Sequence, residues 1–340
     1  MSDGGAAAGE RRGLLLPQLG SDPAETAVRA EELGYDSVWL GELWMQAAPV
    51  KLTEIATRTE RVELGSAILN VYSRTPAVLA MTAATLDRVS DGRFLLGVGT
   101  STRKAVEDLH GMTWDDPNPV RRAHEAVELT KAFLGSSGRV EYDGEAFSAA
   151  DFPALGADVP VYHAALGKAN RRVVARLCDG WLPHNVPFPD LPEAFDYVAE
   201  HAREAGRDPD DIAVAPYVPS AVAEDPADAR DEIRSHLAYY VGNGEGYRRA
   251  VAERFPDEAA EVAAHWRGDG RERDRSAAAA AVTDEMVEAL GVAGTAEEVR
   301  EQFADIESMG VVDRPLVAVP QNASPALAER TMEALAPDAE

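Results

Sequence analysis

The sequence has a single cysteine, Cys178, among its 340 residues. One thiol excludes an internal disulfide framework and a metal cluster held by several thiolates. The chain also lacks an apolar run near the roughly 20 residues that span a bilayer, and its start, MSDGGAAAGERRG, has no apolar core of the signal-peptide type. These absences predict a cytoplasmic protein.

Common catalytic and metal-binding motifs are missing too. The seven histidines show neither HxH nor HExxH spacing, and no cluster of acids and histidines is typical of a zinc site. The chain has no GxSxG elbow and no GxxxxGKS loop. We therefore expect no bound metal, and no serine-hydrolase or P-loop chemistry.

Positive charge is scarce. The chain has 33 basic and 59 acidic residues, a formal net charge of -26, and only four lysines, which are Lys51, Lys104, Lys131 and Lys168. Such a field repels nucleic acid and anionic membranes, so neither is an expected partner. The acidic residues recur along predicted helices, which suggests a solvated surface adapted to a salt-rich cytoplasm that screens self-repulsion. An ordinary acidic mesophilic protein is the alternative.

The sequence does contain a repeated pattern, in which a helical segment ends at glycine and a short apolar run follows. AVRAEELGYDSVWLGE, ANRRVVARLCDGWLPHNVP and VREQFADIESMGVVDRPLVAVP are three instances. Helices that alternate with buried strands indicate parallel strands with crossover helices. The pattern predicts an α/β fold, a (β/α)8 TIM barrel, with strands near 13–17, 37–40, 61–68, 93–97, 160–164, 180–183, 212–218 and 315–319.

Two stretches interrupt the alternation. We expect residues 1–12 to be disordered and 13–340 to form one barrel domain with insertions at about 135–159 and 224–294. The first contains GRVEYDGEAF, which predicts a hairpin. The second is long, acidic and helical, and either shapes the substrate site or serves as an oligomer contact or a salt-solvated excursion.

Candidate site residues follow the predicted strands, because barrel active sites lie at the C-terminal strand ends. After the second strand come Glu42 and Trp44, an acid and an indole that can orient and stack on a polar ring. After the third strand, Asn70 lies in the polar segment NVYSRTP, which either lines a pocket or forms a solvated loop.

Two further strand ends suit an anion. Gly99, Thr100 and Ser101 follow the fourth strand, where glycine allows close approach to a ligand and hydroxyls precede a helix. Gly167 and Lys168 open a helix after the fifth strand, which predicts a phosphate clamp. Helix caps and solvated cations are the alternative for this segment.

Two histidines lie at neighbouring strand ends. His163 ends the fifth predicted strand and His184 follows the sixth, so either can face the same pocket. Each can equally be a hydrogen-bonded structural histidine.

At these residues the chain resembles the luciferase-like flavin and deazaflavin oxidoreductases, a family of (β/α)8 barrels. The resemblance rests on AEELGYDSVWLGE, SRTPAVLAMTAATLDRVSDGRFLLGVGTS, ALGKANRRVVARLCDGW and GTAEEVREQFADIESMGV. The segments GSAILNVYSRTPAV and GRFLLGVGTS are most similar to the coenzyme F420 branch, which includes methylenetetrahydromethanopterin reductases. The resemblance also implies a small-molecule substrate and a homodimer.

The resemblance assigns roles to the candidate residues. It implies a non-proline cis peptide at Ala67-Ile68 that backs the deazaflavin ring, and it gives Gly167 and Lys168 to the phosphate tail of the cofactor. Gly99, Thr100 and Ser101 would lie near the same groove, while Trp44 and Asn70 would line the ring pocket. Glu42 is the nearest acid for a proton transfer that accompanies hydride transfer.

The sequence therefore predicts an enzyme that transfers a hydride between deazaflavin and an organic substrate, with a methylene-tetrahydromethanopterin or methylene-tetrahydrofolate as the best guess. An FMN-dependent luciferase-like monooxygenase on the same fold is the first alternative. A non-catalytic cofactor-binding relative is the second.

Overall fold

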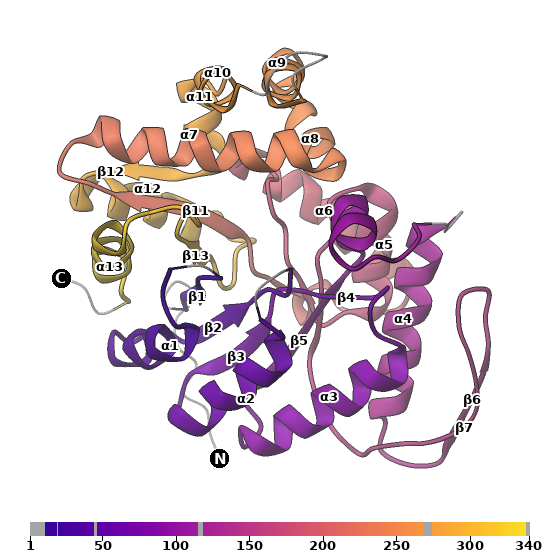
Figure 1. The fold of residues 1–340 in the computed structure, drawn as a ribbon. Helices are drawn as coiled ribbons and strands as arrows, with labels where there is room; N and C mark the ends of the chain where they lie inside the picture. Colours follow the sequence, from indigo (N-terminus) through magenta and orange to yellow (C-terminus); the bar gives the residue numbers. More distant parts are fainter. Residues whose placement is uncertain (1–10, 19, 44–45, 115–117, 268–273, 338–340) are drawn as a thin grey trace.

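The computed structural model describes residues 11–18, 20–43, 46–114, 118–267 and 274–337. A parallel sheet curls around one axis in the order β10-β9-β8-β5-β3-β2-β1-β13-β11 (Figure 1). Its strands are β1 (Gly13–Leu15), β2 (Ser37–Leu40), β3 (Glu63–Ser66), β5 (Phe94–Gly99), β8 (Val161–His163), β9 (Gly180–Trp181), β10 (Ala213–Val214), β11 (Tyr217–Val222) and β13 (Leu316–Ala318).

The barrel closes through the segment that contains β10 and β11. Val214 of β10 pairs with Trp181, whereas Tyr217 of β11 pairs with Leu316, so one stretch of chain joins the two ends of the ladder. Pro216, which lies between them, has no N–H to donate, and its carbonyl accepts a hydrogen bond from the Leu316 N–H at 2.8 Å. The predicted (β/α)8 barrel is confirmed.

Helices surround the barrel, and successive helices contact one another along most of the ring. They are α1 (Pro23–Glu32), α2 (Ala48–Arg58), α3 (Pro76–Val89), α4 (Pro119–Leu134), α5 (Lys168–Leu177), α6 (Leu191–Glu204), α12 (Ala296–Glu307) and α13 (Pro325–Ala334), with short helical turns η1 (Ala105–Leu109), η2 (Phe188–Asp190) and η3 (Pro209–Asp211).

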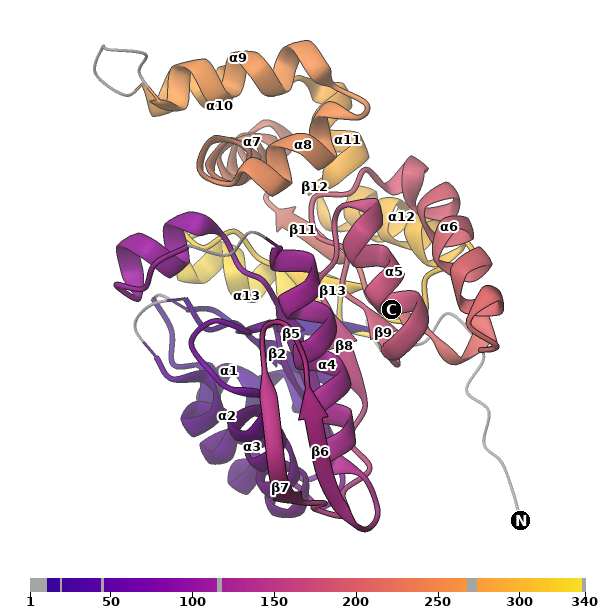
Figure 2. The same ribbon diagram turned by 90° about the vertical axis from the view of Figure 1, so that its right-hand side faces the viewer.

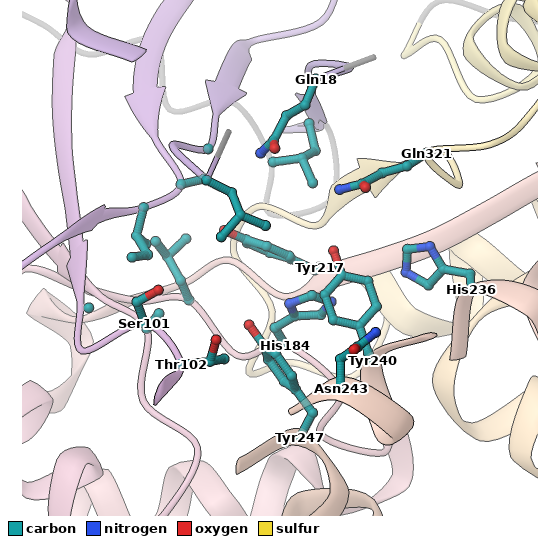
Figure 3. Close-up of a pocket in the computed structure, with 18 of the residues that line it drawn as sticks. Gln18, Ser101, Thr102, His184, Tyr217, His236, Tyr240, Asn243, Tyr247 and Gln321 are labelled. Atoms are coloured by element: carbon teal, nitrogen blue, oxygen red, sulfur yellow. The ribbon is translucent and has the colours of Figure 1, made fainter. Parts of the chain in front are cut away.

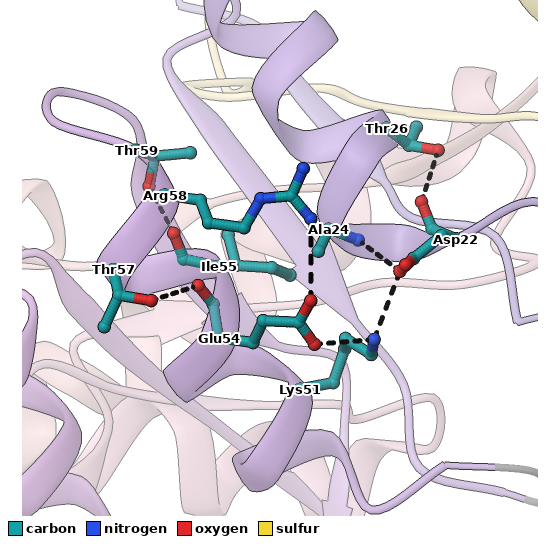
Figure 4. A network of polar contacts seen from close by, with 9 residues as sticks. All are labelled: Asp22, Ala24, Thr26, Lys51, Glu54, Ile55, Thr57, Arg58 and Thr59. Atoms are coloured by element: carbon teal, nitrogen blue, oxygen red, sulfur yellow. Dashed lines mark hydrogen bonds and ion pairs between the residues drawn. The ribbon is translucent and has the colours of Figure 1, made fainter.

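The start of α1 is joined to α2 by a polar network (Figure 4). Asp22 caps α1 by accepting a hydrogen bond from the Ala24 N–H at 3.0 Å, and its carboxylate also lies 3.1 Å from Lys51 Nζ on α2. Lys51 pairs in turn with Glu54 at 2.7 Å, and Glu54 lies 3.5 Å from Arg58. One of the four lysines thus stabilises the barrel wall next to a strand end.

The inside of the barrel is filled by large rings set against glycines. A Cβ at Gly65 would lie 2.1 Å from the Trp39 ring, and a Cβ at Gly180 would lie 2.1 Å from the Tyr162 ring. The two rings meet edge to face with centroids 5.3 Å apart. Because glycine leaves room for each ring, the interior is packed with side chains and the accessible space lies above it.

The earlier of the two predicted insertions is a two-stranded hairpin. Strands β6 (Arg139–Asp143) and β7 (Ser148–Pro153) pair antiparallel outside the barrel (Figure 2). The carboxylate of Glu125 on α4 is fully buried and accepts hydrogen bonds from the backbone N–H groups of residues 145–147. These bonds hold the hairpin turn against the outer ring.

The later insertion contains a helical layer with its own apolar core. It comprises α7 (Pro226–Asn243), α8 (Glu245–Ala252), α9 (Pro256–Arg267), α10 (Arg275–Ala280) and α11 (Asp284–Leu290), drawn in orange at the top of Figure 1. Leu237, Val262 and Met286 are among the buried residues that unite these helices. The chain returns through β12 (Val292–Gly294), a short strand on β11 that the sequence pattern did not predict.

The described part of the chain begins two residues before the first strand. Arg12, which the sequence placed at the end of a disordered segment, pairs with Glu307 at 2.6 Å and donates its backbone N–H to Asp36 at 2.9 Å. Residues 1–10 lie outside the described residues. No helix in the described part of the chain is both long and apolar enough to cross a membrane.

Candidate active site

A cavity of about 1760 Å³ opens at the C-terminal ends of the barrel strands, below α7 and α8. Most of the predicted site residues line it: Glu42, Ala67, Ile68, Gly99, Thr100, Ser101 and Gly167. Asn70 and Lys168 are not among the described lining residues, and Trp44 lies outside the described residues. The strand ends thus bring most of the predicted residues around one cavity, although not every side chain.

The floor of the cavity contains a bulge after β3. Pairing with β5 shifts by one residue between β3 and the two-residue strand β4 (Leu69–Asn70), so the chain has one extra residue there. The Ala67-Ile68 peptide bond within this bulge is cis, as the family resemblance implied. A Cβ at Gly41 would lie 2.7 Å from the Ala67 carbonyl oxygen, and one at Gly99 would lie 3.2 Å from the Ile68 side chain. Two glycines thus allow neighbouring strands to close around the bulge.

Asn70 organises the loop after the bulge. Its Oδ1 accepts hydrogen bonds from the backbone N–H groups of Tyr72 at 3.0 Å and Ser73 at 2.7 Å. The side chain is 1% exposed and its Nδ2 is buried without a partner. In this structure Asn70 therefore does not line the cavity as expected, because an Asx turn directs the side chain onto its own backbone.

Glu42 lies at the cavity wall within an ion pair. Both of its carboxylate oxygens contact the guanidinium of Arg74, one of them at 2.7 Å from Nη2. Oε1 also accepts the Ala48 N–H at the start of α2 at 3.0 Å. The carboxylate is thus held in place by a guanidinium and by a backbone N–H at a helix N-terminus. This geometry favours a positioning role for Glu42 over the predicted proton-donor role.

The end of the cavity that was predicted to bind an anion is formed by two turns, one after β5 and one before α5. Ser101, at φ 61°, lines the cavity with Thr102, whose hydroxyl accepts the Ala105 N–H at 3.2 Å. Gly167 precedes α5 without a side-chain cap, and Asn170 in the first turn of α5 also lines the cavity. The N–H groups of this first turn suit a phosphate.

Lys168 does not point into that site. Its ammonium nitrogen lies 5.7 Å from the centre of the Tyr197 ring on α6, and Lys168 is absent from the described lining residues. The side chain of the first helical residue leans outward against the next helix, which sequence spacing alone could not reveal. In this structure Lys168 therefore does not form the predicted clamp, and the backbone N–H groups at the start of α5 are the remaining candidate groups for an anion.

The two strand-end histidines differ in role: one is structural and the other faces the cavity. His163 is fully buried, with Nδ1 3.2 Å from the Val98 carbonyl and Nε2 3.4 Å from the Asn170 amide. Burial lowers its pKa, and its two ring nitrogens face the Val98 carbonyl and Asn170 Oδ1. His163 is structural, whereas His184 lines the cavity.

Sequence reasoning missed much of the wall opposite the bulge. Figure 3 shows polar side chains that converge there from the first and last strand ends and from the helical layer. These are Gln18, Tyr217, His236, Tyr240, Asn243, Tyr247 and Gln321. Tyr217 begins β11, but the α7 and α8 residues carry no barrel pattern, so no sequence signal directed them to the site. The described residues hold no group of three or more His, Cys, Asp or Glu that could bind a metal ion.

The sequence is similar to those of known proteins over most of its length. A sequence profile described as luciferase-like monooxygenase matches residues 13–313. The chain belongs to the luciferase-like monooxygenase family. A Mycobacterium tuberculosis protein named as a coenzyme F420-dependent oxidoreductase is 30% identical over 336 residues, covering 89% of this chain and 94% of its own. The 5,10-methylenetetrahydromethanopterin reductase of Methanolobus tindarius is 28% identical over 298 residues, covering 86% and 89%.

Solved structures superpose over nearly the whole chain. The coenzyme F420-dependent tetrahydromethanopterin reductase of Methanopyrus kandleri gives a TM-score of 0.79 at 25% identity and covers 97% of both chains. An F420-dependent secondary alcohol dehydrogenase bound to an F420-acetone adduct gives 0.75 at 20% identity, covering 97% of this chain and 98% of its own, and this likeness shows the fold alone.

Proposed function

We propose that this luciferase-like protein is a coenzyme F420-dependent oxidoreductase that transfers a hydride between the deazaflavin and an organic substrate. The observation that carries the proposal is the glycine-flanked bulge at the cavity floor, in a chain similar to proteins that are named for coenzyme F420. The bound cofactor would supply the hydride chemistry, and the protein would orient the reactants and exclude water.

The cavity fits such a cofactor at both ends. Ala67 and Ile68 would back a planar ring, and Gly99, Thr100 and Ser101 would lie along its edge. A Cβ at Gly167 would meet no atom within 4 Å, so there is open space before the N–H groups of α5 that would hold a phosphate. The volume of about 1760 Å³ exceeds the 300–1,000 Å³ of common ligand pockets, which supports two reactants bound together.

A methylene-tetrahydropterin, either methylene-tetrahydromethanopterin or methylene-tetrahydrofolate, is the proposed substrate. The 28% identity to the reductase of Methanolobus tindarius over most of both chains supports this choice. Glu42, fixed by Arg74 and the Ala48 N–H, would keep the loop that follows the bulge in place beside the reactants.

An anaerobic reaction tests the proposal. Reduced F420 mixed with the protein and methylene-tetrahydromethanopterin should be oxidised, with the visible absorbance of the deazaflavin returning in proportion to methyl product. The same assay with methylene-tetrahydrofolate tests the second substrate. Oxygen consumption with reduced FMN and no activity with F420 would favour a monooxygenase, and F420 binding without turnover would favour a non-catalytic relative.

A further inference from the structure

One end of the cavity is an aromatic compartment formed by His184, Tyr217, Tyr240 and Tyr247. The imidazole of His184 is ringed by the three phenols, with centroid distances of 4.6 Å to Tyr217, 4.4 Å to Tyr240 and 5.0 Å to Tyr247. His184 and Tyr217 come from the barrel, and the other two come from α7 and α8, so the helical layer completes the compartment (Figure 3).

The polar atoms of this compartment point into the cavity and have no hydrogen-bond partner among the described residues. Among the described residues, no hydrogen bond joins a ring nitrogen of His184 or one of the three hydroxyls to another protein group, although His184 is only 8% exposed and Tyr217 only 7%. A nearly buried donor or acceptor without a partner costs free energy. Two buried residues, His184 and Tyr217, and two half-buried tyrosines thus direct polar atoms that the described residues leave unpaired towards one cavity, which favours a ligand that pairs with them.

No charged side chain contributes to the pKa shifts of His184, Tyr217 and Tyr247. Burial holds the pKa of His184 well below its ordinary value and raises the pKa values of Tyr217 and Tyr247, so all three are neutral near pH 7. The groups that influence these residues electrostatically are other tyrosines and the buried His236. A charged ligand group would lose its hydration there without gaining an ion pair.

We propose that His184, Tyr217, Tyr240 and Tyr247 bind the organic substrate, and that they select an uncharged planar ring with nitrogen or oxygen atoms that hydrogen-bond to His184. The aromatic faces supply stacking area, and the imidazole and hydroxyls supply donors and acceptors. This inference rests on the proposed function, because the bound ring is a substrate only if the opposite end of the cavity holds the cofactor. It also assigns α7 and α8 as the wall that sets substrate choice.

Binding of 6-methylpterin, a neutral fluorescent ring, tests the compartment, with pterin-6-carboxylate as its charged counterpart. Wild-type protein should quench 6-methylpterin and bind it at least about tenfold more tightly than the carboxylate, because the extra charge would be buried unpaired. His184→Phe keeps the ring and removes both nitrogens, so it should weaken 6-methylpterin binding about 5- to 10-fold, and His184→Gln should restore part of the loss. Folding of each variant is followed by circular dichroism.

His201→Phe is the matched control, because His201 also stacks on a tyrosine, Tyr197, at 4.3 Å but lies outside the described cavity lining. It should bind the probe as wild type does. The inference would be overturned by no binding of 6-methylpterin to wild type, by preference for the carboxylate, or by wild-type affinity in His184→Phe. F420 titration of the same proteins separates the two proposals. If wild-type protein binds 6-methylpterin but not F420, the proposed function is refuted and the ring-binding role of the compartment stands.

Discussion

Replacing Glu42 by glutamine separates the two roles that this acid could have. The carboxylate is 8% exposed and Arg74 is 17% exposed, so their pair is largely screened from water. Glutamine can still accept the Ala48 N–H, but its NH₂ group would face the guanidinium, donor against donor. At least one charge-assisted hydrogen bond is lost, which lowers the free energy of unfolding by about 2 kcal/mol.

Urea unfolding followed by circular dichroism measures this loss. Arg74→Gln should give a similar decrease, and the double variant should lose less than the sum of the two, because both substitutions break one interaction. Under the positioning account, turnover of E42Q falls less than about tenfold and keeps the pH profile of the wild type. A loss of turnover of about 10²–10⁴-fold with unchanged stability and an altered pH profile would refute this reasoning and establish Glu42 as the proton donor.

Four further predictions follow from the packing, the charges and the site. Gly65→Ala should lower the free energy of unfolding by about 1–3 kcal/mol, because its Cβ would lie 2.1 Å from Trp39, whereas Gly167→Ala, with no atom within 4 Å, should change stability little; equal effects in urea unfolding would contradict the packing argument. His236 has its pKa lowered by burial to about 4, so the unfolded chain binds the extra proton as pH falls below about 6.5, and about 3 kcal/mol of stability should be lost between pH 6.5 and 4. His236→Gln should flatten that part of the stability profile, and an unchanged slope would show that other groups cause it. Lys168→Ala should leave F420 affinity within about twofold in a fluorescence titration, while a tenfold loss would restore the lysine clamp. Desalting should unfold a chain of net charge -26, and circular dichroism that is unchanged at low salt would contradict salt adaptation.

Periodicity and strand ends predicted the barrel and most of its mouth. The apolar runs near 37–40 and 93–97 are strands, and Thr100 and Ser101 line the cavity as expected. These succeeded because a strand buried on both faces must be apolar and because a parallel barrel brings its strand ends together. The cis peptide at Ala67-Ile68 came from family resemblance, since nothing in the local composition marks it.

The remaining site residues depend on side-chain direction and on tertiary contacts. Asn70 and Lys168 follow the right strands, but an Asx turn and the outward lean of a first helical residue direct them away from the cavity. Tyr240 and Tyr247 lie about 60 residues after His184 in a helical layer, and only the fold brings them to its ring. Such contacts join distant segments, and one sequence does not encode them as a local pattern.

The central claim is that the cavity floor holds a deazaflavin. An equilibrium titration of the purified protein in molar KCl with F420 and, separately, with FMN measures this most directly through fluorescence quenching. The account predicts saturable binding of F420 at least about tenfold tighter than any binding of FMN. Tighter binding of FMN, or binding of neither, would contradict it.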